Sequence, residues 1–274
     1  YLQDVAADDG DEAGLGGAGA WVLRRAALRC DELPRFRDAL ELTTFCSGVG
    51  PRWAERRTTV RVAGRTAVES AAVWVYVDDA GRPTTLEPWF DEHYGASAGG
   101  RRVSGRLRLP GPPPEAHAVA WPLRSTDFDV LGHVNNAVAW TAVEDELARR
   151  APHGGRVPHG DGPERRLAGA TLEYRAAIDP GDAPELVSSI APGLLSCWLR
   201  CDGDVRTAAV VRLDAAGPPE PAPREPSGES HHGEPRQRGT RRSRRVHGNV
   251  TGLTGTAAFA PGAVPLFSVV IPMW

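Results

Sequence analysis

The chain has 274 residues, a formal net charge of −3 at pH 7 and 24% charged residues. Its length allows one large domain or two of ordinary size, and its charge excludes a generally basic surface that would bind nucleic acid. No run of about 18 apolar residues is present, so we expect neither a membrane span nor a membrane partner.

The four cysteines of the chain form no Cys-x-x-Cys pair. We interpret them as buried thiols of a reducing compartment rather than as a metal or redox site. No signal-peptide pattern is present at the start, so we expect a cytoplasmic protein. We expect no metal and no cofactor. The single methionine is Met273, and we therefore expect that the chain lacks an N-terminal piece or was cut from a longer one.

The first half of the chain is predicted to be a helix followed by strands. Leu2, Val5 and Ala6 lie at helical spacing within residues 1–9, and a glycine-rich break follows. β-Prone segments predict strands at 21–29, 40–46, 57–62 and 67–77. Residues 95–115 then form a Gly/Arg/Pro-rich connection, and we place a domain boundary after residue 112.

The second half has a similar order of elements. The pattern predicts a strand at 117–123, a helix at 136–150, and strands at 168–178, 185–191, 194–201 and 205–213. Residues 217–274 lack clear periodicity, and we interpret them as a disordered tail. The predicted parts are therefore an N-terminal unit, a C-terminal unit and a tail, at 1–112, 113–216 and 217–274.

A faint repeat relates the two halves. Arg29 and Pro34 precede Asp-Ala-Leu-Glu-Leu, and Arg175 and Pro180 precede Asp-Ala-Pro-Glu-Leu, with the same spacing between Arg and Pro. Each instance alone is a common strand-turn-strand pattern. Together they favour tandem copies of one α+β unit, with chance similarity between two hairpins as the alternative.

The chemistry of the chain is concentrated before the predicted helix at 136–150. Asp129, Gly132, His133 and Asn136 fall within eight residues, an arrangement typical of a turn that leads into a helix N-terminus. Such an end offers unpaired N–H groups and positive dipole character, which suit an oxyanion, while a nearby carboxylate acts as base or nucleophile. The alternatives are a turn or capping acid at Asp129, a hydrogen-bonded turn histidine at His133 and capping amides at Asn135 and Asn136.

The segment from Asp129 to Asn136 resembles the Asp-x-x-Gly-His-x-Asn signature of hot-dog-fold thioesterases. Residues 1–6, 21–25 and 31–35 resemble the N-terminal half of acyl-acyl-carrier-protein thioesterases, and the resemblance covers roughly residues 1–215. It implies an α+β fold of two tandem hot-dog units, in which an antiparallel sheet wraps around one long helix. It also implies that the first strand of the family precedes residue 1.

The chain departs from the plant members of this family at three positions. Leu131 stands in place of an Asn between the Asp and the His. Ala177 and Ile178 stand where a Glu-Cys pair follows Glu-Tyr-Arg. The simpler arrangement of an acid and a helix N-terminus is retained, so these departures bear on the mechanism more than on the reaction class.

The resemblance implies a thioester hydrolase that releases free fatty acid from acyl carrier protein, as in fatty acid biosynthesis. Asp129 is the expected general base or nucleophile, and the backbone N–H of Gly132 or His133 is expected to polarise the thioester carbonyl. The His133 side chain would orient the water or donate to the thioester, with Asn136 as support. Glu173 is a candidate second carboxylate, although an exposed strand residue is the favoured interpretation.

The expected partner is acyl carrier protein or coenzyme A with a fatty acyl chain, and a homodimer is left open. Because the carrier protein is acidic, an arginine patch is expected to meet it. Candidates are Arg24, Arg25, Arg56, Arg57, Arg101 and Arg102, with solvated charge as the alternative. Trp74, Trp121 and Trp140 are candidates for the wall of an acyl groove or for ordinary core. The competing functions are an acyl-coenzyme A thioesterase and a non-catalytic acyl-binding module.

Overall fold

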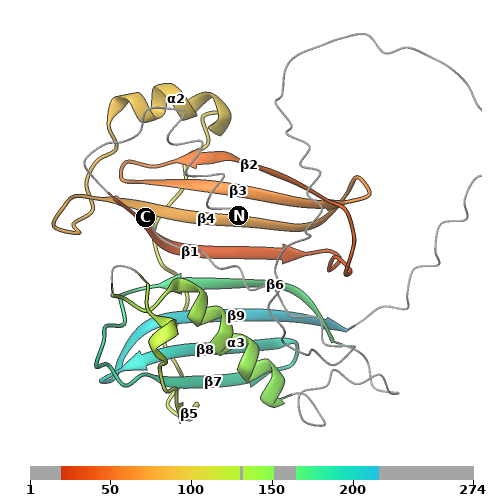
Figure 1. Ribbon diagram of the computed structural model, residues 1–274, viewed down its shortest axis with the longest axis vertical. Helices are drawn as coiled ribbons and strands as arrows, with labels where there is room; N and C mark the ends of the chain where they lie inside the picture. The colour runs from red at the N-terminus through yellow and green to blue at the C-terminus, as the bar shows by residue number, and fades with distance from the viewer. Residues whose placement is uncertain (1–19, 130–131, 151–164, 216–274) are drawn as a thin grey trace, which may run out of the picture.

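One antiparallel sheet dominates the computed structural model, which describes residues 20–129, 132–150 and 165–215. In this described part, nine strands follow the order β2-β3-β4-β1-β6-β9-β8-β7-β5 (Figure 1). The strands are β1 (Ala20–Cys30), β2 (Leu40–Val49), β3 (Trp53–Val62), β4 (Arg65–Val77), β5 (His117–Ala120), β6 (Arg165–Tyr174), β7 (Glu185–Ala191), β8 (Leu194–Cys201) and β9 (Asp204–Ala215). The helices are α2 (Pro88–Ala98) and α3 (Asn136–Arg150), with a single 3-10 turn, η1 (Ser125–Asp127).

The prediction of an α+β fold with a large antiparallel sheet and a long helix is confirmed. The predicted bounds of α3, β7 and β8 agree with the structure residue by residue. Two strands end earlier than expected, β5 at Ala120 and β6 at Tyr174. Neither described helix has the length and apolarity that a membrane span requires. The predicted N-terminal helix and the tail lie outside the described residues.

Helix α2 is absent from the sequence-based prediction, which began an irregular connection at residue 95. The helix starts with Pro88 in its first turn and ends at Gly99, whose φ of 57° is left-handed. Phe90, Tyr94 and Ala98 recur at helical spacing and are buried against β2 and β3. This tertiary packing stabilises a segment that contains a glycine and four aromatic or imidazole side chains, whose intrinsic helix propensity is low.

The strand order repeats on the two sides of the central β1–β6 pair. One side reads β1-β4-β3-β2, and the other reads β6-β9-β8-β7 with β5 added at its edge. The connection from β1 to β2 contains Pro34, and the connection from β6 to β7 contains Pro180. The Arg-to-Pro repeat of the sequence therefore falls at equivalent places in the sheet.

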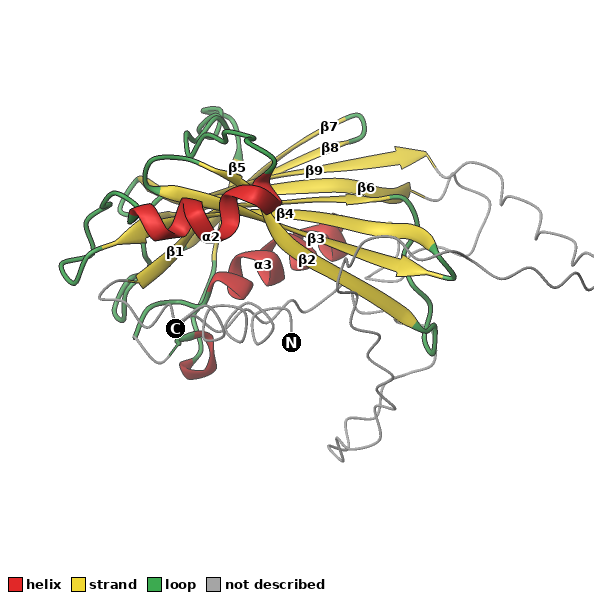
Figure 2. Cartoon of the chain, turned by 90° about the horizontal axis from the view of Figure 1, so that it is seen from above, coloured by secondary structure: helices red, strands yellow, loops and turns green. Residues whose placement is uncertain are grey.

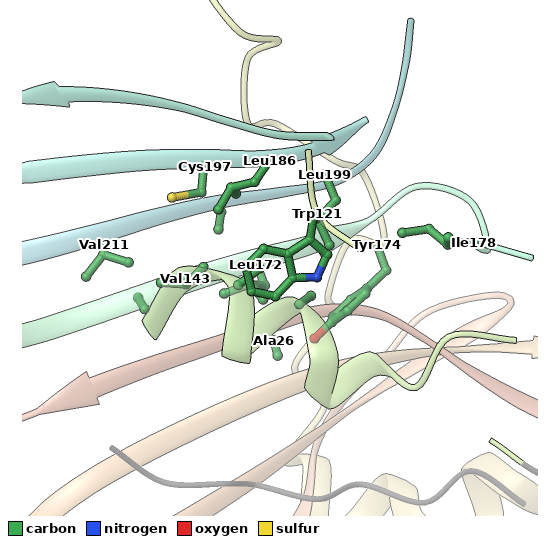
Figure 3. Packing of buried hydrophobic residues seen from close by; sticks show 14 of the residues in the cluster. Ala26, Trp121, Val143, Leu172, Tyr174, Ile178, Leu186, Cys197, Leu199 and Val211 are labelled. Carbon is green, nitrogen blue, oxygen red and sulfur yellow. The ribbon is translucent and has the colours of Figure 1, made fainter. Parts of the chain in front are cut away.

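Helix α3 covers one face of the sheet, which Figure 2 shows nearly edge-on. Val138, Ala139, Ala142 and Val143 of α3 are buried there, and Figure 3 shows part of this core. Its sheet side includes Leu172, which is 0% exposed, and full burial of such a side chain contributes roughly 2 kcal/mol. Three candidate groove residues belong to this packing, since Trp121 is buried and Trp74 and Trp140 are partly buried against it. The four cysteines are free and buried, and the described residues contain no cluster of metal-binding side chains.

Residues 99–116, here called the crossing segment, run over the opposite face of the sheet from α2 to β5. In Figure 1 they pass behind the strands, whereas α3 lies in front. The indole N–H of Trp53 donates to the Val103 carbonyl over 2.8 Å, and that of Trp198 donates to the Pro110 carbonyl over 2.8 Å. The segment therefore binds strands from both sides of the β1–β6 pair.

Glu173 lies under the crossing segment, and the expectation that it is an exposed strand residue is wrong. It is 1% exposed, and its carboxylate accepts the backbone N–H groups of Arg108 and Leu109 over 2.7 and 3.0 Å. Arg175 lies 3.9 Å from the same carboxylate. Because neighbouring strand residues point to opposite faces, Glu173 lies on the face opposite α3 and serves to hold the crossing segment.

Replacing Glu173 by Gln should lower the free energy of unfolding by about 2 kcal/mol, because a buried carboxylate that accepts two N–H groups loses its charge. Urea unfolding measures the loss. Glu69→Gln is the control, since this carboxylate is 31% exposed and pairs with Arg29 over 3.0 Å; it should cost less than about 1 kcal/mol. Equal losses in the two variants would contradict the role of Glu173.

Glu55 on β3 makes a second buried contact with the start of the crossing segment. Its carboxylate accepts hydrogen bonds from Arg101 and, over 2.9 Å, from the Ser47 hydroxyl. Burial acts to raise the pKa of Glu55, but these hydrogen bonds and the charges of Arg101 and Arg57 hold it below its usual value.

Because the folded-state pKa of Glu55 lies below that of the unfolded chain, its contribution to stability is complete above about pH 4.5 and is lost on further acidification. Urea unfolding of the wild type and of Glu55→Gln between about pH 3 and 7 tests this sign. At pH 7, the free energy of unfolding of the variant should be lower than that of the wild type. In the acid range, the free energy of unfolding of the variant should change less with pH. A variant that loses stability on acidification as steeply as the wild type would show that Glu55 is not responsible.

Candidate active site

A closed turn joins η1 to α3 and carries the residues of the sequence motif. Phe128 and Val134 form an isolated antiparallel bridge. The backbone N–H of Asp129 donates to the His133 carbonyl over 2.8 Å, and that of Asn135 donates to the Asp127 carbonyl over 2.8 Å. These bonds bring Asp129 and His133 together, as the spacing predicts. Leu131 lies outside the described residues.

The Asp129 carboxylate is bound within this turn. Its Oδ1 atom accepts the backbone N–H of His133 over 3.1 Å. The backbone N–H of Gly132 donates to the Asp129 carbonyl over 3.1 Å. Both N–H groups that were expected to face a substrate carbonyl are therefore donated to Asp129 in this structure.

Gly132 has a φ of 81°, in the left-handed region that favours glycine. A Cβ atom at this position would meet no described atom within 4 Å. The backbone conformation, rather than crowding by described neighbours, therefore accounts for glycine here.

The end of β6 and the loop after it support the turn. The backbone N–H of Val134 donates to the Ile178 carbonyl over 2.9 Å. The Tyr174 hydroxyl donates to the carbonyl of Asn136, the first residue of α3, over 3.2 Å. Figure 3 shows Tyr174 reaching toward the start of α3, with Ile178 beyond it. Ile178 therefore supports the turn through its backbone, while its side chain belongs to the apolar core.

Asp179 is a carboxylate near the site that sequence reasoning missed. Its Oδ1 atom lies 3.6 Å from Nε2 of His133, and the two side chains are 61% and 45% exposed. A pair so exposed contributes little to stability, but it places a second negative group beside the imidazole. The signal was present in the sequence, because Asp179 directly follows the two positions where the family's Glu-Cys pair is absent.

Asn135 and Asn136 have different surroundings at the start of α3. The Asn135 side-chain oxygen accepts the backbone N–H of Ala137 over 2.9 Å, which is the contact of a helix cap. The expected capping role is thus found at Asn135. Asn136 is the first helical residue, and its Nδ2 atom is buried without a hydrogen-bond partner among the described residues.

The six candidate arginines do not form one surface. Arg56 and Arg57 are neighbours on β3 and therefore point to opposite faces; Arg56 donates to Thr44 over 3.2 Å. Arg101 binds the buried Glu55, and Arg24 donates to the carbonyls of Tyr174 and Arg175 over 3.1 and 3.3 Å. Several of these arginines thus have contacts within the fold, and a single docking patch made of all six is ruled out by their placement.

Gly132→Ala should destabilise the fold by about 1–2 kcal/mol, because a Cβ atom is strained at this φ. It should also speed hydrogen exchange of the His133 amide about tenfold by weakening the bond to Asp129. Gly203→Ala is the matched control, with a φ of 87° and open space in the β8–β9 turn. It should lower stability equally without changing local exchange at His133. Unchanged exchange in Gly132→Ala would contradict the role given to this glycine.

Comparison with known proteins agrees with this fold. Residues 1–87 match the family model for the acyl-ACP thioesterase N-terminal domain. Two uncharacterized proteins of Mycobacterium tuberculosis, from strains CDC 1551 / Oshkosh and ATCC 25618 / H37Rv, are each 25% identical over 214 residues, which is 77% of this chain and 81% of theirs.

Two solved structures share the arrangement of the sheet and helices. The 12:0-ACP thioesterase from Umbellularia californica gives a TM-score of 0.62 at 16% identity, covering 78% of this chain and 87% of that chain. An acyl-ACP thioesterase from Bacteroides thetaiotaomicron VPI-5482 gives 0.58 at 18% identity, covering 78% and 86%. The chain therefore has the hot-dog fold of these thioesterases, and its first 87 residues match the N-terminal domain model of their family, in agreement with the resemblance carried by its sequence motifs.

Proposed function

We propose that the protein hydrolyses the thioester between a fatty acyl chain and acyl carrier protein and releases the free fatty acid. The observation that carries this proposal is the Asp129 carboxylate, held beside Gly132 and His133 at the start of α3. The match of residues 1–87 to the acyl-ACP thioesterase N-terminal domain supports the substrate class. The proposal includes a role in fatty acid biosynthesis, which fits that substrate, and a cytoplasmic location.

Asp129 acts as the general base on a water molecule or as the nucleophile itself. In the base mechanism, the water oxygen attacks the carbonyl carbon, its proton passes to Asp129, and the carbonyl electron pair moves onto the oxygen. Collapse of this intermediate breaks the carbon–sulfur bond. The departing sulfur then takes a proton, for which the His133 imidazole near Asp179 is the proposed donor.

The backbone N–H of Gly132 or His133 remains the proposed oxyanion donor, but the hydrogen bond from His133 to Asp129 must be released as the oxyanion forms. Oδ1 of Asp129 now accepts the His133 N–H over 3.1 Å. When Asp129 takes the proton from water, its carboxyl group becomes a weaker acceptor. The His133 N–H is then able to turn to the negatively charged oxygen, so proton transfer and oxyanion stabilisation are linked in this mechanism.

We further propose that the two sides of the sheet are tandem hot-dog units, with bounds at 1–112 and 113–216. The repeated strand order around the β1–β6 pair supports this division. The active site belongs to the second unit, because α3 and its turn lie there. Glu173 has no place in the chemistry, since it is buried on the face opposite α3 under the crossing segment.

Asp129→Asn should fold normally and lose at least about 100-fold in kcat, because the amide cannot accept the proton of the attacking water. Free-thiol release from acyl carrier protein and coenzyme A esters of several chain lengths measures this. Asp145→Asn is the control, since this carboxylate is 57% exposed on α3, and it should retain wild-type activity.

Each outcome separates the candidate functions. Faster release from the carrier protein ester supports the proposed substrate, and faster release from the coenzyme A ester supports the alternative carrier. An Asp129→Asn variant as active as the wild type would exclude Asp129 from the chemistry. A wild-type protein that binds these esters without cleaving them would be a non-catalytic acyl-binding module.

A further inference from the structure

The Asn136 side chain contains a buried donor that the fold does not use. Its Nδ2 atom is buried, and no described residue accepts a hydrogen bond from it. Buried polar groups nearly always have a partner in native proteins, so an exception calls for an explanation in terms of function. This donor lies three residues beyond His133, at the first position of α3.

Helix capping does not account for this amide group. The N-terminus of a helix presents N–H groups that need acceptors, whereas Nδ2 of Asn136 is itself a donor. The capping acceptor is already supplied by Asn135, whose side-chain oxygen binds the Ala137 N–H over 2.9 Å. Asn136 therefore offers a donor at a place where the helix requires none.

The backbone of Asn136 is held firmly in place. The Tyr174 hydroxyl donates to the Asn136 carbonyl over 3.2 Å. Burial raises the pKa of Tyr174, so its hydroxyl stays protonated and able to donate. The backbone that carries the amide is thus tied to the end of β6, at the point where the turn after Asp129 enters α3.

We propose that Asn136 is a catalytic residue whose side-chain amide donates a hydrogen bond to the thioester carbonyl oxygen and stabilises the oxyanion. This inference rests on the proposed function. The amide is able to donate without breaking a described hydrogen bond, whereas the backbone N–H groups of Gly132 and His133 are both donated to Asp129. Tyr174 is a positioning residue, because it acts on the substrate only through Asn136.

Asn136→Ala tests this role by removing the donor. The variant should lose about 100-fold in kcat, with KM within about threefold of the wild type, as expected for a donor that acts mainly in the transition state. Asn136→Asp keeps the size of the side chain and places an acceptor at the oxyanion, so it should be at least as slow. Asn135→Ala is the matched control, and it should lower Tm through loss of the cap while kcat stays within about threefold.

A second measurement reports the hydrogen bond without catalysis. The probe is a ketone analogue of the acyl carrier protein thioester, in which a methylene group replaces sulfur and the carbonyl carbon is ¹³C. In the wild type and in Asn135→Ala, the carbonyl resonance of the bound probe should move downfield relative to the free probe. In both Asn136 variants this displacement should shrink to what a backbone N–H alone contributes, and Tyr174→Phe should reduce it in part.

The outcomes distinguish this inference from the proposed function. Normal kcat and a normal ¹³C shift in Asn136→Ala, together with an inactive Asp129→Asn, would overturn the role of Asn136 and leave the hydrolase intact. A wild-type protein that binds the probe with the shifted resonance but cleaves no ester would overturn the hydrolase and leave Asn136 as a binding donor. A wild-type protein that neither cleaves the ester nor binds the probe would overturn both.

Discussion

The hydrogen bond from the His133 backbone to the Asp129 carboxylate fixes the acid, the imidazole and the start of α3 relative to one another. It closes the turn over 3.1 Å, and the positive φ of Gly132 lets the chain adopt it. The same bond uses an N–H group that an oxyanion would need. Because of this competition, the proposed mechanism stabilises the thioester carbonyl in two ways. The buried amide of Asn136 donates to it, and protonation of Asp129 releases the His133 N–H.

Strand β6 contacts the crossing segment on one face of the sheet and the start of α3 on the other. Successive residues point to opposite faces, so Glu173 accepts the backbone of the crossing segment while Tyr174 donates to the first residue of α3. The loop after β6 then supplies the Ile178 carbonyl to Val134. Packing on both faces of one strand therefore determines where the Asp129 turn lies.

Local sequence patterns predicted much of this structure, because they depend on neighbouring residues. Helix α3 follows from its apolar period, and the turn before it follows from a glycine between Asp129 and His133. Helix α2, the burial of Glu173 and the approach of Asp179 to His133 depend on contacts between residues far apart in the chain. Local propensity carries no information on such contacts, so Glu173 was expected at the surface and Asp179 was overlooked.

Mass spectrometry of acyl carrier protein after incubation with the full chain tests the central claim most directly. Acyl thioester hydrolysis predicts that the carrier loses the acyl mass and gains a free thiol, with one free fatty acid formed per thiol. The claim would be contradicted if the acylated carrier lost its acyl group no faster with the protein than in buffer alone. It would also be contradicted if the acyl group were transferred to the protein without release of free acid.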